Sequence, residues 1–182
     1  LTILFFVGNV ESQNVQETCN LEVNNLVSGK VNVNGALKQC KNDTLGLIVS
    51  ITNFINDSTT YECYQALNST ITHLSLKSKN SVIKKNAINF FCKNLPNRNS
   101  TITTQAINSL KKFSKNDFDS TSIQIIEQYI NVNYTAYKEL ILLAGYVGNH
   151  KTIEKINELF PNDRNFSKPE RWATHIALAR LG

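Results

Sequence analysis

From about residue 43 onward, apolar residues recur at intervals of three and four, the period of one face of an α-helix. The pattern predicts eight amphipathic helices, joined by loops short enough to make neighbouring helices antiparallel. The residues that define them are Leu45–Ile48–Val49–Ile51–Ile55, Tyr61–Ala66–Leu67–Ile71–Leu74, Ile83–Ala87–Phe90–Phe91, Ile102–Ala106–Leu110–Phe113, Ile123–Ile126–Tyr129–Ile130, Tyr137–Leu140–Leu143–Ala144–Val147, Ile153–Ile156–Leu159–Phe160, and Pro169 to Leu181. An all-α fold without a sheet of three or more strands follows.

Residues that favour helix ends stand between these segments. The expected starts are at Asn42 or Asp43, Asp57 or Ser58, Ser81, Ser100, and Asp119 or Ser120. Gly148–Asn149 is typical of one helix ending and another beginning. Ser167 and Glu170 have the spacing of a capping box. The scarcity of Gly (7) and Pro (3) also favours helices over a fold with many tight turns.

Residues 13–42 lack a clear helical period, and Val31–Asn32–Val33 alternates like a short strand. We therefore predict an irregular N-terminal cap or linker here. The preceding residues, 1–12, contain the apolar run Leu1–Val7, followed by Val10 and Ser12 at the small-residue positions before a cleavage at Gln13. They are expected to be the remnant of a signal peptide; the alternative is a buried first strand or helix.

The four cysteines are Cys19, Cys40, Cys63 and Cys92. None belongs to a CxxC pair and no histidine lies near them at ligand spacing, so zinc is not predicted. An even number of cysteines in an exported chain is compatible with two disulfides, with the pairing left open. Cys63 and Cys92 lie among apolar residues, so each is equally well interpreted as a buried thiol.

Two short segments recur along the chain. Asn86–Asn89 resembles Gln105–Asn108, and Leu143–Gly148 resembles Ala177–Gly182 at an offset of 34 residues, which is the length of a helix–turn–helix repeat. Small residues in the second pair would let helices approach closely; these are Ala144, Gly145, Ala177 and Ala179.

Trp172–Gly182, preceded by Pro169–Glu170–Arg171, resembles the second helix of HEAT repeats, and Ile102–Leu110 and Leu140–Gly148 are looser copies. The resemblance covers about residues 80–182, although most copies lack the usual Val-Arg pair. It implies that residues 43–182 form an α-solenoid of antiparallel helix pairs, which is expected to continue beyond Gly182. In this interpretation Trp172 belongs to a buried stripe with Ile176 and Ala179.

Charge is unevenly distributed along the chain. Residues 63–116 carry nine basic and no acidic side chains, whereas the segments on either side have a slight acidic excess. Within this basic block Lys85, Lys111 and Lys112 are expected to face outward, with Lys84 near the boundary, and the four lysines are expected to form a binding surface for an acidic partner; the alternative is an ordinary solvated face. No aromatic residues are interleaved in a base-stacking pattern, so a nucleic-acid partner is not expected.

Residues that could carry catalysis are not grouped in the sequence. His73, His150 and His175 are far apart, and the sequence has no zinc-protease, nucleophile-elbow, phosphate-loop or calcium-loop motif. No apolar run approaches the roughly 20 residues of a membrane span. We therefore expect an exported, periplasmic or extracellular scaffold without cofactors that binds a protein and is not an enzyme. The alternatives are a helical region of an envelope hydrolase or lyase, and a lipid carrier with an apolar groove.

Overall fold

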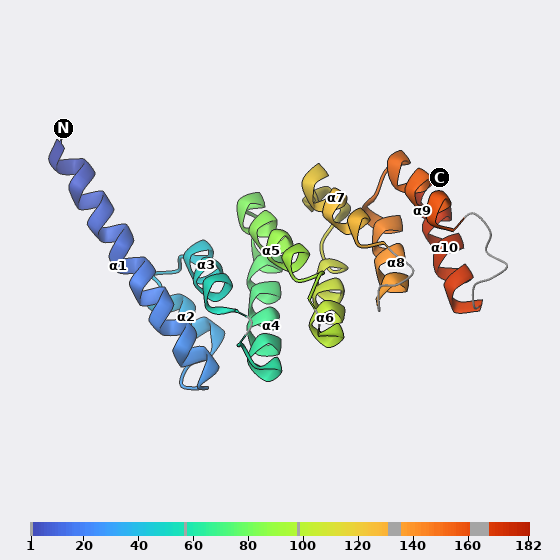
Figure 1. The fold of residues 1–182 in the computed structure, drawn as a ribbon. Helices are drawn as coiled ribbons and strands as arrows, with labels where there is room; N and C mark the ends of the chain where they lie inside the picture. The colour runs from blue at the N-terminus through green and yellow to red at the C-terminus, as the bar shows by residue number, and fades with distance from the viewer. Residues whose placement is uncertain (1, 57, 98, 131–135, 161–167) are drawn as a thin grey trace. The chain divides into compact units, whose positions relative to one another are not determined.

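The computed structural model describes residues 2–56, 58–97, 99–130, 136–160 and 168–182. Within these residues every regular element is a helix (Figure 1). The elements are α1 (Thr2–Val27), α2 (Val33–Gln39), α3 (Thr44–Phe54), α4 (Tyr61–Lys77), α5 (Ser81–Lys93), α6 (Ser100–Leu110), the 3₁₀ turn η1 (Lys115–Asp117), α7 (Ser120–Gln128), α8 (Tyr137–Val147), α9 (His150–Leu159) and α10 (Lys168–Leu181). The predicted all-α class is confirmed, and the eight predicted helices correspond to α3 to α10.

Side-chain caps fix several of these helix starts. The Asp43 side chain accepts a hydrogen bond from the backbone N–H of Gly46 (2.9 Å), and Asp119 accepts one from Ser122 (2.9 Å). The second predicted helix begins later than expected, because its N-cap is Thr60 rather than Asp57 or Ser58. Gly148 ends α8 and Asn149 begins α9, as predicted. Ser167, the first residue of the predicted capping box, lies outside the described residues.

The prediction of an irregular segment over residues 13–42 is wrong. Most of it belongs to α1 and α2, and Val31–Val33 forms no strand. Gly29, which follows the last turn of α1, has a φ of +70°, the left-handed conformation that commonly ends a helix. The Lys30 N–H donates to the Asn25 carbonyl (2.9 Å) and so satisfies one of the last carbonyl groups of α1. The helical period is weak in the sequence because, among the α1 side chains that the structure describes, the buried ones are Cys19, Glu22 and Val23, of which one is acidic.

The chain forms two compact units, Leu1–Ala87 and Ile88–Gly182, and the boundary falls within α5. In the first unit, α1 packs against α2, α3 and α4. The fully buried Leu47, Ile51 and Ile71 contribute to its core. A hydrogen bond from Gln16 Nε2 to Ser50 Oγ (2.7 Å) also connects α1 to α3. The first unit is therefore held together by both apolar and polar contacts between its helices.

In the second unit α8 is the central helix and contacts α6, α7, α9 and α10. Gly145 allows α10 to approach closely, since a Cβ at this position would meet the Cα of Ala177 and lie 2.6 Å from its Cβ. The expected role of small residues is thus confirmed for Gly145 and Ala177. It is wrong for Ala179, which is exposed.

Phenylalanine side chains fill the other part of the second unit's core. The Phe91 ring centroid lies 5.3 Å from that of Phe90 and 6.1 Å from that of Phe113, and all three side chains are buried. These are favourable separations for aromatic pairs. The rings connect the last turns of α5 to the segment that follows α6.

The prediction that Trp172 belongs to the core is wrong, because 62% of the residue is exposed. Helix α10 buries Ala173 and Ala177 instead. These two residues lie one position further along the helix than Trp172 and Ile176, so the buried stripe is rotated by about 100° from the predicted one. Because α10 approaches α8 closely at Gly145, only small residues such as Ala177 fit between the two helices. The Trp172 indole lies at the edge of this interface.

Candidate functional site

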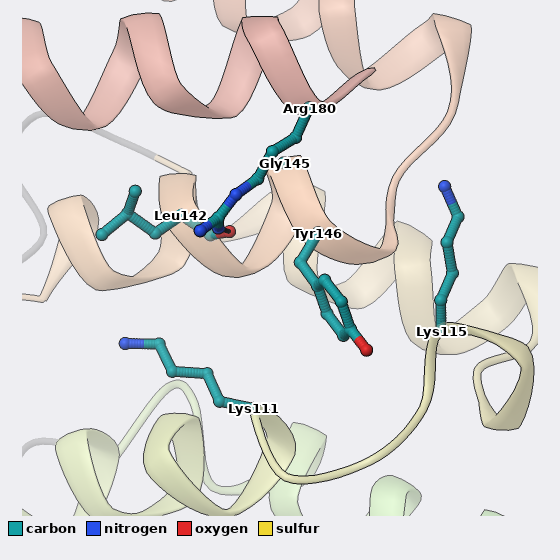
Figure 2. Close-up of a pocket in the computed structure, with 6 residues that line it drawn as sticks. All are labelled: Lys111, Lys115, Leu142, Gly145, Tyr146 and Arg180. Atoms are coloured by element: carbon teal, nitrogen blue, oxygen red, sulfur yellow. Dashed lines mark hydrogen bonds between the residues drawn. The ribbon is translucent and has the colours of Figure 1, made fainter. Parts of the chain in front are cut away.

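A cleft of about 670 Å³ lies in the second unit, and half of its described lining residues are basic (Figure 2). We call it the cationic cleft. The residues that line it are Lys111, Lys115, Leu142, Gly145, Tyr146 and Arg180. They come from the end of α6, from η1, from the middle and end of α8, and from the last turn of α10. Residues up to 69 positions apart in the sequence therefore meet at one place.

The chain between α6 and α7 fixes the two lysines of the cleft. Lys111 is the C-cap of α6, and Phe113 is almost fully buried just after it, which anchors the segment. Ser114 and Asp117 then form a capping box around η1, in which the Ser114 N–H donates to Asp117 Oδ2 (3.1 Å). Lys115, the first residue of η1, is exposed and takes its position from this turn.

Arg180 reaches from α10 across to α8. Its Nη1 donates to the carbonyl oxygen of Leu142 at 3.4 Å, a long contact that uses one of the five guanidinium N–H groups (Figure 2). Tyr146 projects from α8 toward the segment that carries Lys111 and Lys115 (Figure 2). The cleft thus presents a guanidinium, two ammonium groups and a phenol.

The charge of the cleft is of one sign. In the part of the chain that the structure describes, no acidic side chain belongs to its lining, and neither Lys111 nor Lys115 has an ion-pair partner. Like charges that converge in a concave site raise the local positive potential and attract anions. The arrangement is suited to binding carboxylates or other anionic groups, with the guanidinium able to bind in a bidentate manner.

An apolar groove of about 540 Å³ borders the cationic cleft and shares Leu142 with it. The residues that line it are Lys138, Glu139, Leu142, Pro169, Trp172, Ala173 and Ile176. Its largest side chain is the exposed indole of Trp172, while Leu142 and Ile176 are half-buried beside it. An exposed aromatic residue with aliphatic neighbours is typical of a protein-binding surface.

The four lysines predicted to bind a partner are distributed over both units. Lys84 and Lys85 belong to the first unit and Lys111 and Lys112 to the second. Their expected orientation is confirmed, since Lys85, Lys111 and Lys112 are exposed and Lys84 is half-buried. Of the four, Lys111 lines the cationic cleft and Lys112 does not.

Sequence reasoning missed Lys115, Tyr146 and Arg180 as residues of one site. One signal could have found part of it. The 34-residue offset that relates Leu143–Gly148 to Ala177–Gly182 places Tyr146 opposite Arg180 in the alignment, and both residues line the cationic cleft.

All four cysteines are free thiols in the structure, so neither of the two possible disulfides is formed in it. Cys19 and Cys40 are buried neighbours on α1 and the C-cap of α2, and burial raises the pKa of both thiols. Burial raises the pKa of Cys92 to about 12, with nearby Asp119 adding to the effect, and its Sγ lies 4.0 Å from the Ser122 carbonyl oxygen. Cys63 is half-buried on α4.

The histidines do not form a site. His73, His150 and His175 are all exposed, and His150 Nε2 lies 3.7 Å from Glu154 Oε1 one turn along α9. Among the described residues there is no group of three or more His, Cys, Asp or Glu side chains that could hold a metal ion. No described helix is both long enough and apolar enough to cross a membrane.

No protein-family model matches the chain, and the comparisons with curated proteins and with solved structures give no significant match.

Proposed function

We propose that this chain is an exported, HEAT-like helical scaffold that binds an acidic segment of a protein partner through the cationic cleft and has no catalytic role. The observation that carries the proposal is the convergence of Lys111, Lys115 and Arg180 on one concave site, whose lining contains no acidic residue among those that the structure describes. A protein segment rich in Asp and Glu supplies the charge that these groups attract.

Several observations support the solenoid part of the proposal. Consecutive helices α8, α9 and α10 contact one another, and a loop of two residues separates α8 from α9. Repeats of about 34 residues with short connections are characteristic of helical arrays, in which each pair packs on the next. Such arrays use their long surfaces to bind other proteins, which agrees with a binding site built from α6, α8 and α10.

Export rests on the apolar run Leu1–Val7 and the small residues Val10 and Ser12. Cleavage before Gln13 would shorten α1 but leave the Gln16–Ser50 hydrogen bond and the buried Cys19 in place. Expression of the chain behind a complete leader tests this part, because N-terminal sequencing of the exported protein should begin at Gln13. Retention of residues 1–12 on the exported protein would contradict it.

Binding is tested with a fluorescein-labelled glutamate-rich peptide, followed by fluorescence anisotropy. Lys111→Glu with Lys115→Glu should weaken binding about tenfold or more, since it reverses two charges that face the ligand. The matched control is Lys151→Glu with Lys155→Glu, which reverses two charges in the same unit on a surface that already contains Glu127, Glu154 and Glu158. Equal losses in both double variants would show that only net charge matters and would contradict the proposal.

The salt dependence of binding and a charge reversal in the first unit provide two further tests. Binding should weaken as salt rises from about 0.1 M to about 1 M, because the Debye length falls from about 10 Å to about 3 Å. Lys84→Glu with Lys85→Glu tests the rest of the predicted basic surface in the first unit. If this pair weakens binding as much as Lys111→Glu with Lys115→Glu, the cationic cleft is not the principal site.

A further inference from the structure

The apolar groove and the cationic cleft form one continuous surface along α8 and α10. From the groove to the cleft, residue numbers on α10 rise from Pro169 to Arg180, and on α8 from Lys138 to Tyr146. Leu142 lines both parts. A ligand that lies along this surface would contact apolar side chains at one end and basic side chains at the other.

We propose that this surface is a docking channel for an extended, acidic peptide segment that carries a large apolar side chain on one side of its carboxylates. The apolar side chain binds in the groove against Trp172, and the carboxylates bind Lys111, Lys115 and Arg180. The inference rests on the proposed function of the cationic cleft and adds the chemistry and the spacing of the segment that it recognises.

Charge and burial favour this occupant over others. The described lining of the cationic cleft contains three cations and no acidic residue, so the part of a ligand that binds there should be anionic. The groove end has one residue of each sign, Lys138 and Glu139, so its selectivity comes from the apolar contacts. A peptide residue that covers the exposed Trp172 would remove a large apolar area from water, which is how aromatic residues dominate many protein interfaces. The neighbouring carboxylates supply the charge complement.

The separation of the two ends sets the spacing in the ligand. Trp172 and Arg180 are eight residues apart on α10, which corresponds to about 12 Å at the helical rise. An extended chain covers this distance in about four residues. The recognised segment should therefore have its large apolar residue about three to five positions from its acidic residues. Segments in which the two features are adjacent should bind more weakly.

The test uses synthetic peptides without tryptophan, because Trp172 is the only tryptophan of the chain and reports directly on the groove. The reference peptide carries one leucine and, about four residues further on, three glutamates. Three matched peptides replace the leucine by serine, replace the glutamates by glutamines, or move the leucine next to the glutamates. The reference peptide should shift the Trp172 emission to shorter wavelength and bind about tenfold more tightly than each matched peptide.

Variants of the protein turn this comparison into a double-mutant cycle. Trp172→Ala should weaken the reference peptide about tenfold, measured by anisotropy of a labelled peptide, and leave the serine peptide unchanged. Lys111→Glu with Lys115→Glu should weaken both. If Trp172→Ala affects both peptides equally, or neither, the docking channel is wrong while the cationic cleft remains a binding site. If the lysine reversal changes neither, the proposed function fails instead.

Two other occupants give distinct outcomes. Vesicles that contain phosphatidylserine would show whether an anionic lipid surface is preferred; cleft-dependent binding to vesicles without binding to the reference peptide would overturn the proposal. Sedimentation of the protein alone tests for a second copy in the channel. A dimer that Trp172→Ala dissociates would also overturn it, whereas a monomer that binds the reference peptide supports it.

Discussion

The two units differ in how they use aromatic and apolar residues. Among the residues whose side chains the structure describes, the first unit has one phenylalanine, Phe54, which is half-buried, whereas five are buried in the second. The exposed large apolar residues Leu21, Val27, Leu76 and Val82 of the first unit line none of the clefts described here, while Tyr146 and Trp172 in the second both do. Scattered apolar exposure is normal, but apolar exposure beside a concave, charged site indicates binding.

Both units bury polar side chains, and in the first unit most of these lie on α4. In α4 the Ser75 hydroxyl donates to the Ile71 carbonyl (2.6 Å) and Thr72 donates to Asn68 (2.8 Å), so buried hydroxyls are satisfied within their own helix. Glu22 is buried with Oε1 bonded to Asn25 Nδ2 (3.0 Å). The second unit also buries polar side chains, among them Thr103 and Thr152, so its core is distinguished by the cluster of phenylalanine rings rather than by a lack of polar groups. Phe113, one of the packed rings, is buried between Lys111 and Lys115 in the sequence and so anchors the segment that carries these two residues of the cationic cleft.

The largest expected difference in stability between the two units comes from truncating a buried phenylalanine ring. Phe91→Ala should reduce the free energy of unfolding of the second unit by about 3–5 kcal/mol, because Phe91 is fully buried between Phe90 and Phe113. Denaturant melts followed by Trp172 emission report on the second unit, and circular dichroism reports on both. Leu21→Ala, which truncates an exposed side chain of the first unit, is the control and should change little. A loss below about 1 kcal/mol for Phe91→Ala would show that the rings do not define the core.

A matched pair of glycine substitutions should have opposite signs in the two units. Gly145→Ala should destabilise the second unit by about 1–3 kcal/mol, because the new methyl group meets the backbone of Ala177. Gly35→Ala in α2 should be neutral or stabilise the first unit by up to about 1 kcal/mol, since its nearest neighbour would be 3.5 Å away and alanine favours a helix. Thermal melts of both variants measure the difference. Equal shifts would mean that the α8–α10 contact is not tight.

Alkaline pH should destabilise the second unit through Cys92. The pKa of this thiol is raised to about 12 in the folded chain from an ordinary value of 9.0, so its contribution is fully present below about pH 9 and is lost as pH rises toward 12. At pH 10 the loss should be on the order of 1 kcal/mol. Urea melts at pH 8 and pH 10 measure it, and Cys92→Ala should remove this part of the pH dependence. An unchanged slope in Cys92→Ala would rule out the thiol as its cause.

The smallest expected effect concerns Trp172. Because 62% of this residue is exposed, Trp172→Ala should cost less than about 1 kcal/mol of stability while it weakens peptide binding. Circular dichroism melts supply the measurement, since the variant lacks the fluorescent residue. A loss in the core range of about 3–5 kcal/mol would show that the indole supports the fold after all.

Helix positions were predictable because they depend on neighbours in the sequence. The Asp43 and Asp119 caps and the Gly148–Asn149 junction act within one helical turn, so the chain displays them directly. The helix over the N-terminal segment was not predicted because few of the described α1 side chains are buried, and these include Cys19, a residue with no strong helical signature. Local patterns are informative only where the buried face is broad.

Facts that depend on tertiary contacts were harder to predict. The side of α10 that is buried is set by the fit of Ala177 against Gly145, and periodicity alone could not distinguish this face from the one that carries Trp172. The cationic cleft combines Lys111 with Arg180, which only the fold brings together. The uneven distribution of charge did indicate a basic surface, but the sequence favoured Lys84, Lys85 and Lys112 equally with Lys111.

Hydrogen bonds connect the turn between α8 and α9 to α7, so local opening of the turn also affects α7. Asn149 N–H donates to Thr152 Oγ1 (2.9 Å), and the fully buried Thr152 hydroxyl donates in turn to Glu127 Oε1 of α7. Opening this turn therefore breaks a contact with a helix that lies more than twenty residues earlier in the chain. In a hydrogen-exchange measurement the Asn149 amide should exchange at the slow rate of the surrounding helices, although it lies in a loop, and should accelerate together with α7.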